Sequence, residues 1–329
     1  MAEALWLSQD NVQSLGITMG EVMAGVEEGW RLKGEGLVEL PAKPGVHPRR
    51  DCYIHAMPCW IGGDIDAAGL KWVAGYPDNP AQRGLPYNTG LFILNDCETG
   101  LVKAVMDANW ITTWRTGAAS AIGARYLASP EASVLALIGL GTQGRINLRA
   151  LVEALPNLKE VRLYDLFPAQ VGSFLAEMEP LFPALAYRTC SSVEEVCAEA
   201  DVVITCTPIL AEPKRIVRSS WLKEDVLCIA VDYDSAFDAD VMTGGEIFVC
   251  DDRNQYLWTQ DHGVYFQAGY PREKEIYADM GEIVAGRKAP VRRGRRAALF
   301  MGIASHDVMT ARTIYARARQ AGVGTVVPL

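Results

Sequence analysis

Residues 134–165 contain the feature that most constrains this chain, a glycine turn set between two short apolar runs. The run at 134–138 is typical of a buried strand, and it leads into Gly139-Leu140-Gly141-Thr142-Gln143-Gly144. A helical pattern follows to 155, and a second β-rich run at 161–164 ends on Asp165, 21 residues after Gly144. This order predicts a βαβ unit that binds a dinucleotide.

Each glycine of the turn has a separate physical task in such a unit. Gly139 permits the tight turn, Gly141 lets the backbone approach a pyrophosphate, and Gly144 lets the helix pack close to the strand. Amides at the helix N-terminus then face the phosphates. Asp165 would accept hydrogen bonds from the adenine ribose and repel a 2′-phosphate, and residues 166–168 offer no cation. We therefore predict NAD(H) rather than NADP(H); a purely structural βαβ unit is the alternative.

Composition excludes several other classes of protein. The chain has 329 residues, enough for two domains, half of them apolar, and a net charge of −9 that argues against nucleic acid as a partner. The eight cysteines form no CxxC pair, and the four histidines show no metal-site spacing, so we expect reduced thiols, no metal and a cytoplasmic protein. No secretory signal pattern starts the sequence, and no apolar run reaches about 18 residues, so no membrane span is expected.

The pattern along the chain predicts an α/β fold with two kinds of sheet. A helix at 17–32, strands at 53–60 and 70–75, and a hairpin of 91–94 with 101–106 indicate an α+β domain with an antiparallel sheet. After a helix at 112–128, strands alternate with helices, which predicts a doubly wound parallel sheet. The predicted strands are 134–138, 161–164, 202–206, 227–231 and 247–249.

The last part of the chain is predicted to contain a helix at 276–285, a basic loop at 286–296 and a terminal helix at 304–321. The basic run RKAPVRRGRR contains Pro290 and Gly294 and no aromatic residue. A solvated loop or a contact between subunits is favoured over a surface for nucleic acid or membranes.

Four polar residues interrupt apolar or small-residue context and are candidates for a site. Lys71 lies in a strand-like run, Arg115 begins a helix of small residues, and Arg50 lies in a loop. Two arginines and a lysine suit an α-carboxylate, which the guanidinium fork binds bidentately. Asp234 follows the fourth predicted strand of the parallel sheet, where ligands bind, although Asp232 and Asp238 compete for that role. Surface positions are the structural alternative for Lys71 and Arg115.

These residues lie in segments that resemble the ornithine cyclodeaminase/μ-crystallin family, which also includes archaeal-type alanine dehydrogenase and ketimine or imine reductases. The resemblance covers nearly the whole chain. It is carried by AMPCW, GLKWVAGYPDN, FILNDCETG, MDANWITTWRTGAASAIGARYLA, the glycine turn, WLKEDVLCIAVDYDS and GIASHDVMTARTIYARA.

The resemblance implies a homodimer with a substrate-binding and dimerisation domain at 1–116 and 304–329 and a Rossmann domain at 117–303. By position, Arg50, Lys71 and Arg115 match carboxylate-binding residues, Met57 a pocket residue, and Asp234 the catalytic acid/base. The predicted cofactor contacts are Gly139, Gly141, Thr142, Gln143, Gly144, Asp165, Thr116 and Thr207.

The chain departs from the family pattern at three points. The Pro-Gly-Lys that follows the acid is absent after Asp234, and the serine of F-x-S-x-G is lost in Phe300-Met301-Gly302. No residue between Met57 and Lys71 matches the substrate-binding glutamate. These differences weaken ornithine as the substrate more than they weaken redox chemistry.

The main hypothesis is an NAD(H)-dependent enzyme acting at the Cα–N bond of a carboxylate-bearing amino acid or imine, with Asp234 and Lys71 as catalytic residues. A cyclodeaminase-type lyase that releases ammonia and recycles NAD is the runner-up. A protein that binds NADH and a ligand without turnover, as in relatives of μ-crystallin, is the alternative from another class.

Overall fold

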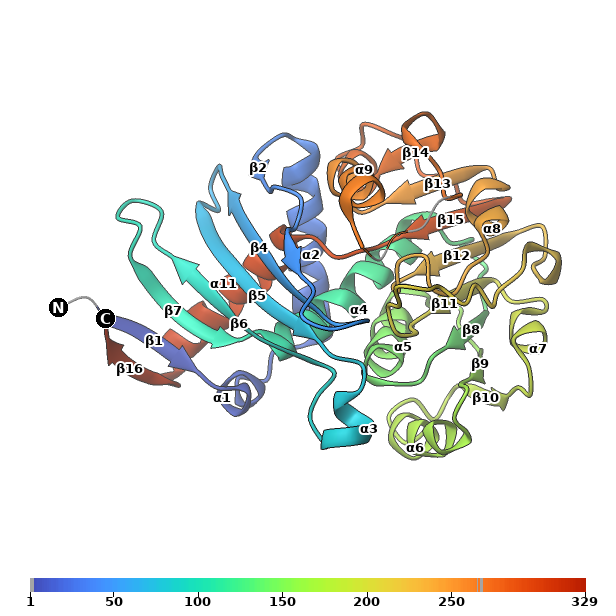
Figure 1. Ribbon diagram of the computed structural model, residues 1–329, viewed down its shortest axis with the longest axis horizontal. Helices are drawn as coiled ribbons and strands as arrows, with labels where there is room; N and C mark the ends of the chain where they lie inside the picture. Colours follow the sequence, from blue (N-terminus) through green and yellow to red (C-terminus); the bar gives the residue numbers. More distant parts are fainter. Residues whose placement is uncertain (1–2, 265, 267–268) are drawn as a thin grey trace. The chain divides into compact units, whose positions relative to one another are not determined.

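The computed structural model describes residues 3–264, 266 and 269–329 of the chain. The chain divides into two compact units, of which unit 1 comprises Met1–Arg115 and Gly302–Leu329 and unit 2 comprises Thr116–Met301. Figure 1 labels the elements of both. The roles that the resemblance assigns to the two parts of the chain stay predictions.

Unit 1 is built on one eight-stranded sheet, counted over the described residues, in the order β16-β1-β7-β6-β5-β4-β2, with β3 also paired to β4. Its neighbouring strands are antiparallel except for β1 and β7. The strands are β1 (Glu3–Leu7), β2 (Val38–Glu39), β3 (Gly45–Val46), β4 (Tyr53–Ile61), β5 (Ala67–Gly75), β6 (Asn88–Asn95), β7 (Val102–Asp107) and β16 (Thr325–Pro328).

One helix of unit 1, α11, covers the middle of this sheet. It contacts β4, β5 and β6 and lies beside α2 (Figure 1). The α2 helix begins at Thr18, whose side chain forms a capping box with Glu21. The helices are α1 (Gln9–Ser14), α2 (Met19–Gly34), α3 (Asn79–Arg83) and α11 (Ala304–Ala321), and α4 (Ala108–Leu127) runs from the end of unit 1 into unit 2.

Unit 2 contains a second sheet, of eight parallel strands within the described part of the chain, in the order β10-β9-β8-β11-β12-β15-β13-β14. The strands are β8 (Val134–Ile138), β9 (Glu160–Tyr164), β10 (Ala186–Thr189), β11 (Val202–Thr205), β12 (Val226–Ala230), β13 (Ile247–Cys250), β14 (Ile276–Asp279) and β15 (Arg295–Leu299). The helices are α5 (Thr142–Ala154), α6 (Pro168–Met178), α7 (Val193–Cys197), α8 (Ala239–Thr243), α9 (Arg253–His262) and α10 (Met280–Val284).

The position of β8 between β9 and β11 makes the carboxyl end of β8 a topological switch point, where open parallel sheets bind ligands. The glycine turn follows β8 directly. The predicted fold class, a Rossmann doubly wound sheet combined with an α+β domain, is confirmed.

Two predictions for the last third of the chain are wrong. Residues 276–285 are not one helix: β14 comes first, and α10 starts after Asp279, whose side chain caps it. The run at 286–296 is not wholly a solvated loop, because Arg295 and Arg296 begin β15. Arg296 is buried and binds Asp225 at 2.7 Å. Short apolar runs do not separate strand from helix by periodicity, and a strand that starts with arginines resembles a loop.

Two further findings concern the whole of the described chain. None of its helices is both long and apolar enough to cross a membrane. All eight cysteines lie in the described residues and form no disulfide bond, and six of them are buried.

Candidate active site

The glycine turn of unit 2 has the geometry that the sequence predicted. Gly139 has a φ of +90°, and a Cβ there would lie 2.6 Å from the Cys206 carbonyl oxygen. A Cβ on Gly144 would lie 2.2 Å from the Gly139 oxygen. By contrast, a Cβ on Gly141 would meet no described atom within 4 Å. Gly139 and Gly144 are therefore required for close packing of the backbone. Gly141 leaves open space beside the exposed Thr142 at the start of α5.

Asp165 lies at the carboxyl end of β9 and binds the turn directly. Its Oδ2 accepts from the Leu140 amide at 2.8 Å, and its Oδ1 accepts from the Phe167 amide at 2.9 Å. Carboxylate oxygens have further acceptor capacity for ribose hydroxyls. The Gln143 Oε1 is buried and has no hydrogen-bond partner among the described residues, as expected where a ligand donor completes a site. These residues fit a dinucleotide.

Thr116 and Thr207, the other predicted cofactor contacts, are each held by their surroundings in unit 2. Thr116 is buried on α4, beside Gly117, where a Cβ would lie 2.8 Å from the Ile146 oxygen of α5. Thr207 follows β11, and both its amide (2.9 Å) and its hydroxyl (2.6 Å) donate to Asp232 Oδ2. Their contact with a cofactor stays a prediction.

The three competing acids after β12 have different surroundings. Asp232 is buried, and it also accepts from the Thr205 hydroxyl at 2.7 Å. Burial raises its pKa to about 6, against the lowering effect of these hydrogen bonds. Asp238 is half-buried and precedes α8. Asp232 is thus occupied with neutral donors that tie β11 to β12.

Asp234 is fully buried and has a cationic neighbour that the sequence analysis missed. Arg215 Nη2 donates to its Oδ2 at 3.1 Å, and the Arg215 guanidinium lies 5.2 Å from the centre of the Tyr270 ring. Tyr233 has a φ of +59°, the left-handed region that costs a non-glycine residue free energy, and it separates the two buried acids. Arg215 supplies a positive charge in a chain that lacks the lysine of Pro-Gly-Lys.

In unit 1, Lys71 and Arg115 meet at an acid on α11. Lys71 on β5 is directly opposite Met57 on β4, so both side chains lie on the face that α11 covers. Lys71 Nζ lies 2.8 Å and Arg115 Nε 3.1 Å from Asp307 Oδ1. Lys71 and Asp307 are 0% exposed. We call Lys71, Arg115 and Asp307 the basic cluster.

Burial changes the ionisation of this cluster. It lowers the pKa of Lys71 to about 7, with a further lowering by Arg115, while the charge and hydrogen bond of Asp307 act in the opposite direction. Next to the cluster, His306 packs edge-on against Trp30 at 4.5 Å. Burial first, then Arg115 and Lys71, hold the pKa of His306 well below its ordinary value. The surroundings of Lys71 thus place its titration near neutrality.

Arg50 is not brought to this cluster. Its side chain is 68% exposed, and its Nε lies 3.7 Å from Asp51. The predicted role of Arg50 in carboxylate binding stays a prediction. Asp307 is the functional candidate that sequence reasoning missed, although the polar triplet Ser305-His306-Asp307 at the start of an otherwise apolar helix face was a signal.

Gly302, the glycine of the shortened segment Phe300-Met301-Gly302, lies against Arg115. Its φ is +81°, and a Cβ at this position would lie 2.2 Å from Arg115 Nη1. A side chain here would displace the guanidinium, so the glycine and the position of Arg115 depend on each other.

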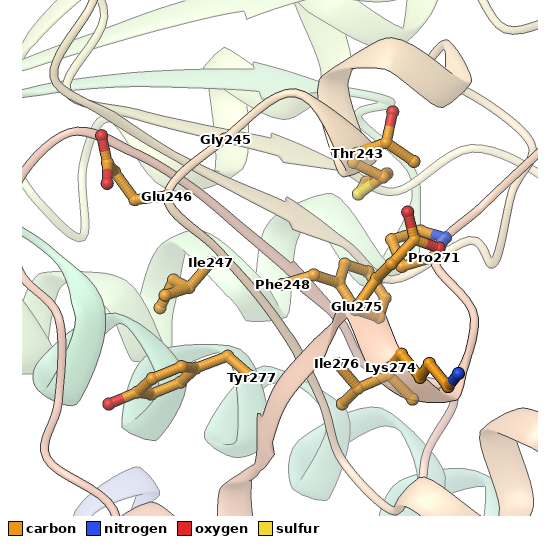
Figure 2. A pocket seen from close by; sticks show the side chains of 11 residues that line it. Thr243, Gly245, Glu246, Ile247, Phe248, Pro271, Lys274, Glu275, Ile276 and Tyr277 are labelled. Atoms are coloured by element: carbon orange, nitrogen blue, oxygen red, sulfur yellow. The ribbon is translucent and has the colours of Figure 1, made fainter.

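A cavity of about 240 Å³ in unit 2 lies away from these residues. Figure 2 shows its lining, which includes Glu246, Phe248, Glu275 and Tyr277 near the first residues of β13 and β14. None of the predicted site residues lines it. Ligands of open parallel sheets bind at the carboxyl ends of the strands, so we do not assign the substrate to this cavity. No cluster of metal-ligating side chains occurs in the described residues.

The fold and these side chains define a two-unit protein of the Rossmann dinucleotide-binding class, in which unit 2 contains the glycine turn and unit 1 contains the buried cations Lys71 and Arg115. The chain belongs to the ornithine cyclodeaminase/mu-crystallin family, whose sequence model matches residues 3–322. The alanine dehydrogenase of Archaeoglobus fulgidus is 33% identical over 331 residues, which cover 99% of this chain and 98% of the relative.

Two solved structures extend the similarity to the whole fold. An archaeal alanine dehydrogenase dimer with bound NAD has a TM-score of 0.86 and 32% identity, with 100% of both chains covered. Thermococcus litoralis Δ(1)-pyrroline-2-carboxylate reductase, in complex with NADH and L-proline, has a TM-score of 0.85 and 30% identity over 98% of this chain and 99% of the other.

Proposed function

We propose that this protein is an NAD(H)-dependent oxidoreductase that acts at the Cα–N bond of an amino acid or its imine. The observation that carries the proposal is the basic cluster, in which two basic side chains share one carboxylate and leave one positive charge when Lys71 is protonated. An α-carboxylate supplies the missing negative charge. The open glycine turn and Asp165 support NAD(H), as do relatives named for alanine dehydrogenation and pyrroline-carboxylate reduction.

The side chains have separate tasks in this proposal. Arg115 and Lys71 bind the substrate carboxylate and thereby orient Cα. Asp234 exchanges a proton with the substrate nitrogen, and Arg215 fixes the orientation of that carboxyl group. Gly139, Gly141, Thr142, Gln143, Gly144 and Asp165 would hold the cofactor, with Thr116 and Thr207 as further contacts. When bound, NAD(H) supplies or accepts the hydride.

The test is NADH consumption with a panel of 2-keto acids plus ammonia or methylamine, and with cyclic imines. NAD with L-ornithine, assayed for ammonia, tests the cyclodeaminase alternative. We expect NADH loss with an imine, and a decrease in kcat of roughly 10²- to 10⁴-fold in Asp234→Asn, because general acid–base catalysis contributes about that much. Asp238→Asn, a neighbouring half-buried acid, is the matched control and should retain activity.

The outcomes separate the three hypotheses. Ammonia release from ornithine without net NADH change would replace the reductase by the lyase. NADH binding without turnover of any substrate would favour a binding protein. Equal activities of Asp234→Asn and Asp238→Asn would remove Asp234 from the mechanism.

We also propose a cytoplasmic homodimer. The sheet face opposite α11 carries exposed aromatic side chains, because Trp72 (48% exposed) alternates with Lys71 on β5 and pairs with Leu91 (40% exposed). Trp60 is 43% exposed on β4. Large exposed apolar side chains on one face of a sheet are typical of a protein interface, and the archaeal relative is described as a dimer. Light scattering should give twice the chain mass, and Trp72→Glu should give the single-chain mass.

A further inference from the structure

Asp307 has no role in the proposed function so far, although it contacts both cations that the function needs. We propose that Asp307 is a positioning residue, which holds Lys71 and Arg115 in the arrangement that binds the carboxylate of the substrate. This inference rests on the proposed function and deepens it. It adds an acidic residue to the two cations of the site. It also implies that the substrate presents a single negative charge, its carboxylate, to the basic cluster.

The geometry shows why one acid can position both cations. A single oxygen, Oδ1 of Asp307, accepts from Lys71 Nζ at 2.8 Å and from Arg115 Nε at 3.1 Å. The three side chains come from β5, α4 and α11, and their exposed fractions are 0%, 7% and 0%. A shared acceptor therefore fixes the separation of the ammonium and the guanidinium, whose own chains are long and flexible.

The second oxygen of Asp307 indicates that the site is incomplete without a ligand or water. Oδ2 is buried and has no hydrogen-bond partner among the residues that the structure describes. A buried acceptor without a donor is unfavourable, so a donor is expected in the occupied state. The charge balance is a separate argument for an anionic ligand, because two basic side chains face one carboxylate and a second carboxylate, which accepts from these cations and does not donate to Oδ2, would neutralise the cluster.

The other titratable groups around Lys71 do not replace Asp307. On β4, burial lowers the pKa of His55 to about 2 and raises that of the Cys59 thiol far above its ordinary value. On α11, His306 is held neutral, and on β6 the residue opposite Lys71 is Phe92. Arg115 on α4 repels the Lys71 charge. Asp307 is the group in this set that favours the protonated lysine.

The experiment compares Asp307→Asn with Ser305→Ala, a fully buried residue of the same helix whose hydroxyl has no partner in the described structure. NADH turnover with the best imine is measured against pH. Loss of a hydrogen bond to a charged group should raise the KM for the imine by roughly 10- to 100-fold in Asp307→Asn, while the NADH Kd stays unchanged. The alkaline limb of kcat/KM should also move to lower pH, because Asp307 raises the pKa of Lys71.

Asp307→Glu separates charge from position and also serves if the asparagine variant does not fold. It keeps the negative charge but moves the oxygens, so we expect a raised KM with an alkaline limb close to that of the wild type. Wild-type KM in a folded Asp307→Glu protein would contradict a positioning role. A pH profile of kcat/KM in Asp307→Asn that is parallel to that of Ser305→Ala would also contradict the positioning role.

A readout without turnover distinguishes failure of this inference from failure of the proposed function. The Lys71 side chain can be titrated by NMR of protein with ¹³Cε-labelled lysine, using Lys71→Met to assign the signal. A lower Lys71 pKa in Asp307→Asn than in the wild type would support the coupling even if no imine is reduced. An unchanged Lys71 pKa would overturn it even if turnover is observed.

Discussion

The candidate sites in the two units are formed by different kinds of groups, backbone atoms in unit 2 and charged side chains in unit 1. In unit 2, the glycine turn and Asp165 lie within 27 consecutive residues, and backbone amides and open space make the site. In unit 1, the basic cluster joins side chains 236 residues apart in the sequence, and all three are charged and buried. A backbone site tolerates changes that leave its conformation intact. A buried charge cluster depends on every partner, because removal of one leaves the others uncompensated.

Lys71→Met is the strongest test of this contrast. Breaking a buried ion pair typically costs about 3–5 kcal/mol, and we expect the lower end, because Arg115 still pairs with Asp307. Arg31→Met is the control in the same unit: Arg31 is 41% exposed and pairs with Glu28, and an exposed pair contributes roughly 0–1 kcal/mol. Urea denaturation measures both free energies of unfolding. If Lys71→Met and Arg31→Met lose the same free energy of unfolding, the buried basic cluster stabilises the fold no more than a surface ion pair does.

Asp232→Asn tests a buried acid of unit 2 that has neutral donors only. Burial raises the folded pKa of Asp232 from 3.8 to about 6, so its contribution to stability is complete below pH 4 and is lost as the pH rises to 6. The contribution is at most about 3 kcal/mol. The wild type should therefore lose stability relative to Asp232→Asn between pH 4 and 6. Parallel stability curves across this range would show that the carboxyl group ionises normally in the fold.

Asp165→Asn tests whether one side chain selects the cofactor in the otherwise backbone-built site. Loss of charged hydrogen bonds should raise the NADH Kd by roughly 10- to 100-fold. NADPH should lose less affinity, because the carboxylate that repels a 2′-phosphate is gone. Fluorescence titration with both cofactors measures the ratio. An unchanged ratio of the two affinities would remove Asp165 from cofactor selection.

Gly141→Ala has the smallest expected effect and is the most specific test of the turn. Its φ of −72° suits alanine and its Cβ has open space, so stability should not change, while NADH affinity should fall roughly tenfold, or about 1.4 kcal/mol. Gly144→Ala should instead lose roughly 1–3 kcal/mol of stability, because its Cβ meets the Gly139 oxygen at 2.2 Å. Full NADH affinity in a folded Gly141→Ala protein would mean that no phosphate approaches this backbone.

The errors of the sequence analysis have a common physical origin. The β14 strand and the α10 helix were merged into one helix because a short apolar run has no distinctive period. Arg296 was placed in a solvated loop because its partner, Asp225, is 71 residues away. Residue type also did not separate Arg50, which is exposed, from Arg115, which is buried, and the role of Arg50 in carboxylate binding stays a prediction.

Local sequence was sufficient for the βαβ unit, the glycine turn and Asp165, because turns and helix termini depend on φ, ψ and the few residues around them. It also identified Lys71 and Arg115 as unusual, since each interrupts an apolar or small-residue pattern. The pairing of both with Asp307, and of Asp234 with Arg215, came from the folded chain alone. The desolvation of a charge depends on which distant segments surround it, and no local pattern encodes that.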